Sequence, residues 1–501
     1  MIARDNILLG ILIPLIVTTV PVSAVTPPDQ IFQDISPMIR QLPGRQSVPD
    51  QYIILLKEGG TSTPADILGE YGLHARAQFE RIRGFASPLT TLQISRLRSD
   101  PRVALVEQDQ LAYAFAVNRE ALPPFPVFPK FPSFPGFPRS SSSSSSVSSS
   151  TPISSSSSSS SSSFSSSSSS SSSFSSSSSS SSSFSSSSSS FSSSVSIAST
   201  QIIPTGIRRI DALLSSIADI DSLDEQPDMD IAVIDTGVSR THPDLRLFNS
   251  VNFSSDVSAD DLNGHGSHVA GTAAAKDTTA GVVGVAPGAR IWSVKVLNRQ
   301  GSGYMSDIIK GIDFVTAHAG EIEVANMSLG CQCTSPALDT AIKRSVAAGV
   351  VYVVAAGNAG KDAATFSPAN NPDVITVSAI ADFNGLPGGG AKSTCRSDVD
   401  DTFADFSNYG ADIDIAAPGV CIYSTWKNTG FSTISGTSMA SPHVAGAVAL
   451  YLLNHPKPRN AADVAALRSA IIAAGSDQSG SNGFTGDRDS YREPLLNVGG
   501  F

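Results

Sequence analysis

Residues 230–238 read Asp-Ile-Ala-Val-Ile-Asp-Thr-Gly-Val, and this stretch indicates the fold class. Its central apolar residues, 231–234, are typical of a strand buried in a parallel sheet. Thr236 and Gly237 then turn the chain, so Asp235 stands at the carboxyl end of the strand. Open α/β sheets place their functional side chains at that edge. The stretch therefore predicts an α/β fold with a carboxylate in its site.

A histidine and a serine follow, each at the head of a helical run. His265 opens an Ala/Gly-rich run, and Ser438 precedes the apolar run 439–453. A serine hydroxyl is a weak nucleophile at neutral pH unless an imidazole takes its proton and a carboxylate holds that imidazole in the right tautomer. We therefore predict that Asp235, His265 and Ser438 form a catalytic triad. His268, one turn from His265, is expected to be a packed, hydrogen-bonded histidine.

A fourth motif ends in an amide side chain. Residues 350–358 read Val-Val-Tyr-Val-Val-Ala-Ala-Gly-Asn, a β-branched strand followed by small residues. An amide in that place suits a donor to the oxyanion of an acyl-transfer reaction, paired with the backbone N–H of Ser438. We therefore assign Asn358 to an oxyanion hole.

The order Asp, His, Asn, Ser with these neighbours resembles the subtilisin-like serine proteases. Residues 296–303 and the motif Phe-Ser-Asn-Tyr-Gly at 406–410 resemble the proteinase K branch of that family most closely. The resemblance covers about residues 200–480 and implies a serine endopeptidase. Ser267 departs from the family, which usually has threonine there, but the hydroxyl is retained. An alternative from another class is a catalytically idle extracellular wall or matrix protein.

Apolar strands alternate with helical runs in residues 200–501, which we take as the catalytic domain. This alternation predicts a mostly parallel, twisted sheet flanked by helices, as the resemblance also implies. The expected strands include residues 291–297, 324–329 and 374–379, and the expected helices include 306–318 and 336–348.

The resemblance also implies how protein or peptide substrates bind. An extended peptide is expected to pair with two backbone segments, and small residues are expected to line its first pocket. Met305 corresponds to the fourth pocket. No acidic residue is identifiable at the base of the first pocket, which favours broad cleavage after apolar residues. The two segments are Gly301, Ser302, Gly303 and Ser328, Leu329, Gly330, and the first pocket has Ala355, Ala356 and Gly357.

Structural calcium is a further implication of the resemblance, whereas no cofactor is expected for catalysis. The family's strong site uses two backbone carbonyls and a carboxylate, which match Pro372, Val374 and Asp414 here. Ligation by oxygen alone suits calcium. Asp244 matches a ligand of a second site, but Thr278 stands where that site has asparagine, so the match there is incomplete.

Composition and the amino-terminal residues indicate a secreted protein. The chain has 501 residues, a formal charge of −11 and 15% charged residues, which argues against nucleic-acid binding. Residues 1–24 read as a signal peptide, with an apolar run from Ile7 to Val20 and Val-Ser-Ala before the cleavage point. A retained membrane anchor is the alternative, but the run is short for a span. We expect an extracellular, monomeric mature protein without a membrane segment.

Four cysteines in an exported chain predict one or two disulfides, for which three pairings exist. We favour Cys395 with Cys421, which flank a long segment. Cys331 and Cys333 are separated by one residue, and a bridge between them would be strained. A zinc site is a poor alternative because no histidine is near the Cys-x-Cys pair.

Residues 49–116 resemble the inhibitory propeptide of the same family, which acts as an intramolecular partner of the protease. A strand at 51–56, a helix at 89–97 and a closing strand after 99–102 predict a small α+β domain. In the helix, Leu92, Ile94 and Leu97 are expected to face inward. An unrelated α/β module is the alternative.

Residues 117–199 are expected to form a disordered linker. Proline and phenylalanine alternate in 122–138, and 140–196 are almost wholly serine, so the segment cannot bury enough apolar surface to offset its ordering entropy. The linker is read as a stalk or as a passive spacer. Its root-mean-square span of about 50 Å lets the propeptide tail reach the cleft. We predict a first cut close to residues 114–116 and a slower trim near residue 200.

Overall fold

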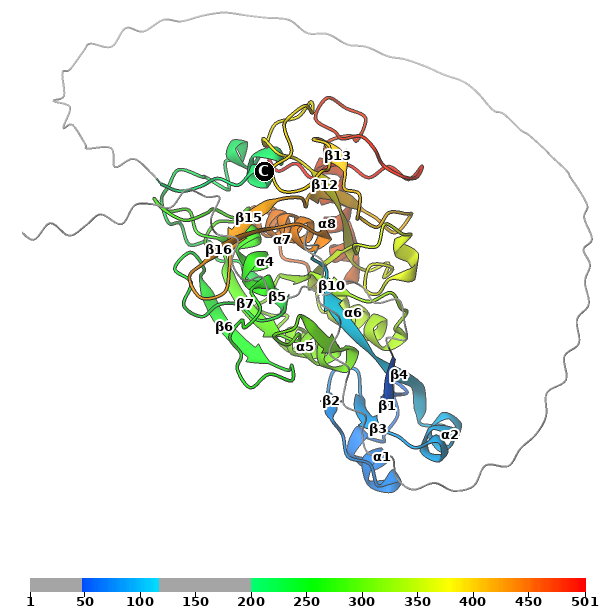
Figure 1. The fold of residues 1–501 in the computed structure, drawn as a ribbon. Coiled ribbons are helices and arrows are strands. Elements are labelled where there is room, and N and C mark those ends of the chain that lie inside the picture. Colours follow the sequence, from blue (N-terminus) through cyan, green and yellow to red (C-terminus); the bar gives the residue numbers. More distant parts are fainter. Residues whose placement is uncertain (1–46, 117–199) are drawn as a thin grey trace, which may run out of the picture. The chain divides into compact units, whose positions relative to one another are not determined.

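A mostly parallel sheet of eight strands lies at the centre of residues 200–501 in the computed structural model, which describes residues 47–116 and 200–501 (Figure 1). The predicted α/β fold class is confirmed. Apart from the antiparallel pair β12 and β13, the strand pairs of this sheet are parallel. The strand order is β13 (Thr402–Phe403), β12 (Ile375–Ala381), β11 (Val351–Ala355), β9 (Val324–Met327), β5 (Asp230–Asp235), β7 (Arg290–Lys295) and β6 (Leu247–Asn252), and β14 (Ile415–Pro418) pairs with β12.

Helices pack against this sheet in two pairs. The helix α4 (His265–Ala274) packs on α7 (Thr437–Leu453), and α5 (Met305–Ala317) packs on α6 (Pro336–Ala347). The start of α6 follows from its sequence, because the Ser335 side chain accepts a hydrogen bond from the Leu338 N–H and a proline opens the helix. The remaining elements of this part are α3 (Thr205–Arg209), α8 (Ala461–Ala474), two short 3₁₀ turns, and the hairpin β15 (Ile422–Thr425) and β16 (Phe431–Ile434).

Residues 47–116 form a small α+β unit with an antiparallel sheet. The strands are β1 (Ser47–Leu56), β2 (Ala77–Phe79), β3 (Gly84–Pro88) and β4 (Val103–Ala114), and the helices are α1 (Pro64–Tyr71) and α2 (Thr91–Ser99). Both helices begin with a capping box, Thr63 with Asp66 and Thr90 with Gln93.

The expected helix of this unit differs from α2 in its start and in one buried position. The helix begins at Thr91, because Thr90 is its N-cap. Leu97 is fully buried and Ile94 packs on the core, but Leu92 is 60% exposed, so its expected inward orientation is wrong. Five residues separate Leu92 from Leu97, which turns the two side chains about 140° apart on the helix.

We call residues 200–501 the larger part. The strand β4 extends out of the small unit and continues between two strands of the larger part. Its end pairs with β8 (Ser302–Tyr304) and β10 (Leu329–Gly330), both antiparallel. Ala112 lies opposite Gly303, and Tyr113 lies opposite Ser302 and Gly330. The end of β4 is therefore bound as an extended peptide by the two predicted substrate-binding segments.

Two disulfides are present, and no free cysteine occurs in the described ranges. The favoured pair, Cys395 with Cys421, is confirmed. The structure also joins Cys331 to Cys333, the pair that the short spacing argued against. A turn of the backbone brings their Cα atoms to 5.3 Å, a distance that a disulfide spans.

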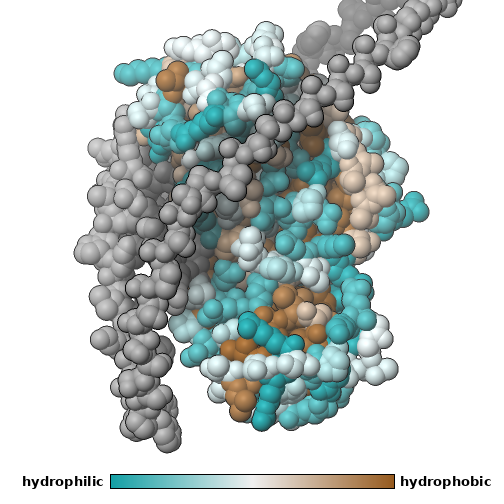
Figure 2. Space-filling model, turned by 90° about the vertical axis from the view of Figure 1, so that its right-hand side faces the viewer, coloured by the Kyte–Doolittle hydropathy of each residue, from teal (hydrophilic) through white to brown (hydrophobic). Residues whose placement is uncertain are grey.

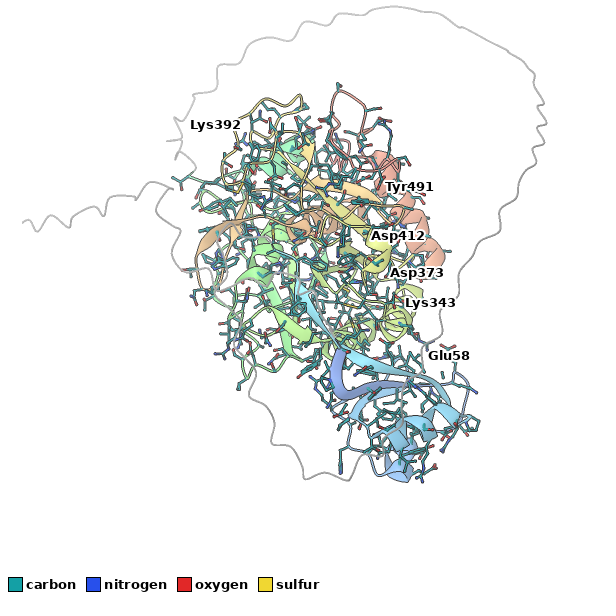
Figure 3. The ribbon with its side chains drawn as sticks, turned by 45° about the vertical axis from the view of Figure 1, so that its right-hand side comes forward. Glu58, Lys343, Asp373, Lys392, Asp412 and Tyr491 are labelled. Atoms are coloured by element: carbon teal, nitrogen blue, oxygen red, sulfur yellow. A yellow bond between two sulfur atoms is a disulfide. The ribbon has the colours of Figure 1, made fainter. Side chains whose placement is uncertain are left out.

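Polar residues predominate on the face drawn in Figure 2, with apolar residues scattered among them. Charged residues such as Glu58, Lys343 and Lys392 lie at the periphery (Figure 3). Among residues 47–116 and 200–501, no helix is long and apolar enough to cross a membrane. The predicted signal peptide (1–24) and linker (117–199) lie outside the described residues.

Candidate active site

Asp235 and His265 are in direct contact in the interior of the larger part. Asp235 is the last residue of β5 and His265 is the first residue of α4, and both side chains are fully buried. The His265 Nδ1 atom lies 2.8 Å from Asp235 Oδ1 and 3.0 Å from Oδ2. A carboxylate on Nδ1 leaves Nε2 as the nitrogen that can accept a proton. Among the described residues, this buried Nε2 has no hydrogen-bond partner.

Ser438 is brought to the same site by α7, but its hydroxyl has another partner. Its Oγ donates to the backbone oxygen of Ser328, 2.9 Å away, and the Ser328 Oγ donates in turn to the backbone oxygen of Ser438. Ser328 follows β9, the neighbour of β5 in the sheet. The direct contact between Ser438 Oγ and His265 Nε2 is absent in this conformation.

The amide of Asn358 is oriented by the residue before Ser438. Asn358 Oδ1 accepts from the Thr437 N–H at 2.9 Å and from the Thr437 Oγ1 at 2.8 Å. These bonds leave the Nδ2 group of Asn358 as a free donor, and this buried atom has no partner in the described part of the chain. A buried donor without a partner is costly unless a ligand satisfies it.

The carbonyl of Phe115, in the tail after β4, lies beside this donor. A Cβ atom added to Gly436 would lie 2.3 Å from Phe115 O and 3.0 Å from Asn358 Nδ2, so only glycine leaves room for both. The Ala114 N–H donates to Gly301 O and the Phe115 N–H to Ser328 O, at 3.0 and 3.2 Å. The tail therefore presents a peptide carbonyl to the amide of Asn358 and to the start of α7.

The side chain of Phe115 fills an apolar pocket and is 2% exposed. A Cβ atom on Gly330 would come within 2.8 Å of the Phe115 ring, so this wall must be glycine. Of the predicted pocket residues, Ala355 packs in the cluster around Phe115, whereas Ala356 and Gly357 are buried beside Asn408. The cluster also holds three residues that the sequence did not single out, Ala363, Phe366 and Ala369.

Carboxylates of the small unit bind the starts of two helices. Glu107 accepts from the Ser335 Oγ at 2.5 Å and the Ala337 N–H at 2.9 Å, where α6 begins. Asp109 accepts from the Ser306 Oγ at 2.6 Å and from its N–H at 3.2 Å, where α5 begins. Negative charge is stabilised at helix amino termini, which offsets part of the cost of burying these two carboxylates. Burial raises the pKa of both carboxyl groups.

The residues next to His265 have structural partners. The His268 Nε2 atom contacts the backbone oxygens of Ile422 and Ser432, and burial lowers the pKa of His268 to about 3. It is therefore a packed, neutral histidine, as expected. The Ser267 Oγ donates to Asp261 Oδ2 at 2.7 Å, so the hydroxyl retained at this position has a partner.

The expected calcium ligands are bound by an arginine instead. From α8, Arg468 donates through Nη1 to Pro372 O at 2.5 Å and through Nη2 and Nε to Asp414 Oδ1 at 2.5 and 3.1 Å. The other oxygen of Asp414 accepts from the Thr376 N–H. Because a guanidinium already supplies the positive charge beside Pro372 and Asp414, a calcium ion held by Pro372, Val374 and Asp414 would have to displace Arg468, and calcium binding there stays a prediction.

Replacing Arg468 with methionine is expected to lower the free energy of unfolding by about 1–2 kcal/mol. The substitution leaves the Asp414 carboxylate, which is 9% exposed, without its cation. Urea unfolding with and without calcium measures the effect. Calcium should stabilise the variant more than the wild type, because the carboxylate then accepts a metal. An equal response of both proteins to calcium would contradict the idea that Arg468 supplies the positive charge that a calcium ion would otherwise supply.

The family model and the sequence relatives of this chain point to one family. The family model described as "Subtilase family" matches residues 227–487. Subtilisin DY of Bacillus licheniformis is 42% identical over 230 residues, covering 45% of this chain and 77% of that protein. Subtilisin NAT of Bacillus subtilis subsp. natto is 34% identical over 436 residues, covering 85% of this chain and 86% of that protein. A crystal structure of a cold adapted subtilisin-like serine proteinase aligns with 59% of this chain and 97% of its own, at 34% identity and a TM-score of 0.45. Because the family model spans more than half of the chain and Subtilisin NAT matches most of it, the chain belongs to the subtilase family and is a serine-type endopeptidase.

Proposed function

We propose that the chain is the precursor of a secreted endopeptidase that cuts itself after Phe115. Residues 47–116 act as its propeptide, and the bond between Phe115 and Ala116 is the first substrate. The position of Phe115 carries this proposal, because its ring fills the pocket and its carbonyl lies beside the Asn358 amide.

The chemistry follows from four side chains, those of Ser438, His265, Asn358 and Asp235. Ser438 Oγ turns from Ser328 O to His265 Nε2, gives its proton to that nitrogen and attacks the carbonyl carbon of Phe115. Asn358 Nδ2 and the Ser438 N–H hold the oxyanion. His265 then gives its proton to the amine of Ala116 as the C–N bond breaks, and a water molecule releases the acyl group from Ser438 by the same route. Asp235 keeps the imidazole oriented throughout.

Two further observations support a propeptide role for residues 47–116. The similarity to Subtilisin NAT covers 85% of the chain, which is more than residues 200–501 account for. The docked unit also places carboxylates on α5 and α6 and fills the cleft with β4. Occupying the cleft in this way excludes other substrates, so the uncut precursor is inactive toward them.

Substrate preference is proposed from the same pocket. Ala355, Ala363, Phe366 and Ala369 pack in the cluster around Phe115, so the mature enzyme prefers aromatic or other apolar residues before the cut. Among peptides that differ only at this residue, we expect phenylalanine to give the highest kcat/KM and aspartate the lowest. Mature enzyme with no preference between phenylalanine and aspartate would contradict the pocket assignment.

Mass spectrometry of the activating precursor tests the first cut. A first product ending at Phe115 is expected, followed by a slower trim near residue 200. A first product that begins near Ile202, without an earlier species carrying the serine tract, would refute the order.

A phosphonate directed at serine nucleophiles should label Ser438 in the processed chain. Absence of labelling would favour an idle extracellular protein.

Secretion, the signal peptide at 1–24 and a monomeric mature enzyme belong to the same proposal. The family relation and the presence of two disulfides support an oxidising, extracellular setting. Sequencing the amino terminus of secreted material tests the export and the processing together.

Docking of the propeptide is expected to weaken as pH rises. Burial raises the pKa of Glu107 and Asp109, and of Asp307 and Asp313 on α5, above the ordinary carboxyl range of about 4. The docked state then binds these protons more tightly than the open state does. The contribution of these protons to the free energy of docking is complete below pH of about 4. It is lost as the pH rises through the raised pKa values of the docked state.

Hydrogen exchange of β4 in the uncleaved Ser438→Ala precursor measures this dependence, after correction for the intrinsic effect of pH. Protection should fall between acid and neutral pH. Asp109→Asn removes one titrating group and should flatten the profile. Protection that rises with pH would contradict the prediction.

A further inference from the structure

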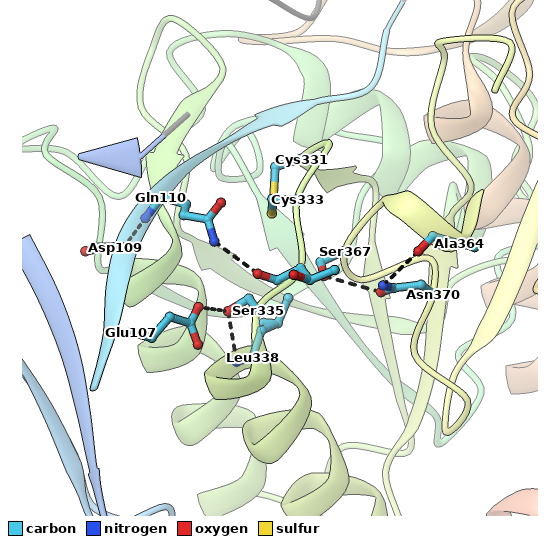
Figure 4. The surroundings of a disulfide bond; sticks show 11 residues. Glu107, Asp109, Gln110, Cys331, Cys333, Ser335, Leu338, Ala364, Ser367 and Asn370 are labelled. Carbon is cyan, nitrogen blue, oxygen red and sulfur yellow. Dashed lines mark hydrogen bonds between the residues drawn. A yellow bond between two sulfur atoms is a disulfide. The ribbon is translucent and has the colours of Figure 1, made fainter. Parts of the chain in front are cut away.

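A three-residue disulfide loop adjoins the pocket that holds Phe115. The loop is Cys331-Gln332-Cys333, and it follows directly on the glycine wall at Gly330, at the end of β10 (Figure 4). Cys331 is fully buried, whereas Cys333 is half-buried and accessible from solvent. The disulfide therefore lies between the pocket and the surface.

The backbone of Cys331 ties the glycine wall to a second wall. Its N–H donates to Ser367 O at 2.9 Å, and its carbonyl accepts from the Ser367 N–H at 3.1 Å. Ser367 follows Phe366, whose side chain packs with Phe115. The residue that carries the disulfide thus connects Gly330 with Phe366 across the pocket.

The middle residue of the loop contacts the segment that follows Asn358. Gln332 Oε1 accepts from the Lys361 Nζ at 3.1 Å. Lys361 lies three residues beyond Asn358, and its N–H and that of Ala359 both donate to Asn408 Oδ1. The segment that includes Asn358 is in this way linked to the loop.

The residues after the loop contact the propeptide tail. The backbone oxygen of Thr334 accepts from the Gln110 Nε2 at 3.1 Å, and the Ser335 Oγ donates to Glu107, as Figure 4 shows. Any change in the course of residues 331–335 therefore alters the pocket and the docking of β4 together.

We propose that the Cys331–Cys333 disulfide is a positioning element that holds the first pocket at the width of an aromatic side chain. Closing the loop removes backbone freedom from residues 331–333, so the pocket is ordered before the substrate arrives. Opening the disulfide lets the Gly330 wall move relative to Phe366 and Lys361. An aromatic residue then loses contacts with the Gly330 and Phe366 walls, whereas alanine, which does not reach those walls, loses little.

This inference rests on the proposed function, because it requires that the Phe115 site is the substrate pocket. Its test compares processed enzyme with and without the loop disulfide. The variant is Cys331→Ser combined with Cys333→Ser, and the control is Cys395→Ser combined with Cys421→Ser, which removes the other disulfide. Both are assayed with two peptides that have phenylalanine or alanine before the cut.

The loop variant is expected to raise KM for the phenylalanine peptide by about tenfold, the factor that corresponds to the freedom of about one ordered backbone residue. Its kcat for either peptide and its KM for the alanine peptide should stay within about twofold of the wild-type values. In the control variant the ratio of the two kcat/KM values should stay at the wild-type value. An unchanged ratio in the loop variant, or an equal change in the control, would overturn the inference.

If the loop variant does not fold, two other measurements test the same proposal. Gln332→Ala keeps the disulfide but removes the bond to Lys361, and a smaller shift of the same sign is expected. Mild reduction of folded wild-type enzyme, with alkylation mapped by mass spectrometry, should change the ratio in step with modification of Cys333. No change of the kcat/KM ratio in either measurement would reject the proposal that the Cys331–Cys333 disulfide positions the pocket. Wild-type enzyme that lacks a preference for phenylalanine over alanine would instead reject the proposed pocket.

Discussion

Replacing Ser438 with alanine is expected to lower peptide hydrolysis by about 10⁶, a factor known for subtilisin itself and carried over to this relative. We expect the Ser438 hydroxyl to form the acyl intermediate with help from His265, because the other hydroxyl at the start of α7, Thr437 Oγ1, donates to Asn358 Oδ1. Removing the Ser438 hydroxyl takes one of two donors from Ser328 O, which should cost little because the Phe115 N–H and the Ser328 Oγ bond to α7 remain. Activity is measured on a peptide substrate after the precursor is opened by another protease.

The same variant should accumulate as an uncut precursor, since Ser438 also cuts after Phe115. Ser441→Ala is the matched control, because Ser441 is another buried serine of α7 whose Oγ donates to Asn326 Oδ1. The control should be processed and active. Normal processing of the Ser438→Ala chain, in a host without other proteases, would exclude self-cleavage.

Replacing Asn358 with leucine is expected to lower kcat by about 10²–10³ with little change in KM, again a magnitude measured on subtilisin. The amide donates to oxygen only as charge develops, so its loss affects the transition state more than the bound peptide. Steady-state kinetics on the phenylalanine peptide separate the two constants. An unchanged kcat would show that Nδ2 is not directed at the oxyanion.

The second role of Asn358 calls for a control. Its Oδ1 accepts two hydrogen bonds from Thr437, which leucine also removes. Asn358→Asp keeps that acceptor but replaces the donor with an oxygen. Loss of kcat in both variants, with a lower free energy of unfolding only in the leucine variant, would assign the catalytic effect to the donor.

Local sequence patterns predicted the central sheet and the long helices of residues 200–501 well. The apolar run before Asp235 became the fully buried strand β5, and the run after Ser438 became α7. In the small unit the sequence reading missed α1, although Thr63 and Asp66 carry a capping-box signal that could have found it. The orientation of Leu92 was wrong because Leu92 and Leu97 lie about 140° apart on the helix, which also begins two residues later than expected.

The sequence by itself determined the identity and order of the reactive groups, because each depends on a short motif at the end of a strand or the start of a helix. Only the tertiary structure decided what those groups contact. It turned the Ser438 hydroxyl to Ser328, brought Phe366 to the Phe115 pocket and joined Cys331 to Cys333. It also placed Arg468, 54 residues away in the chain, on the carboxylate expected to bind calcium. Contacts between residues so far apart leave no periodic pattern in the sequence, since they form only when the packing of α8 on α6 and α7 brings the two side chains together.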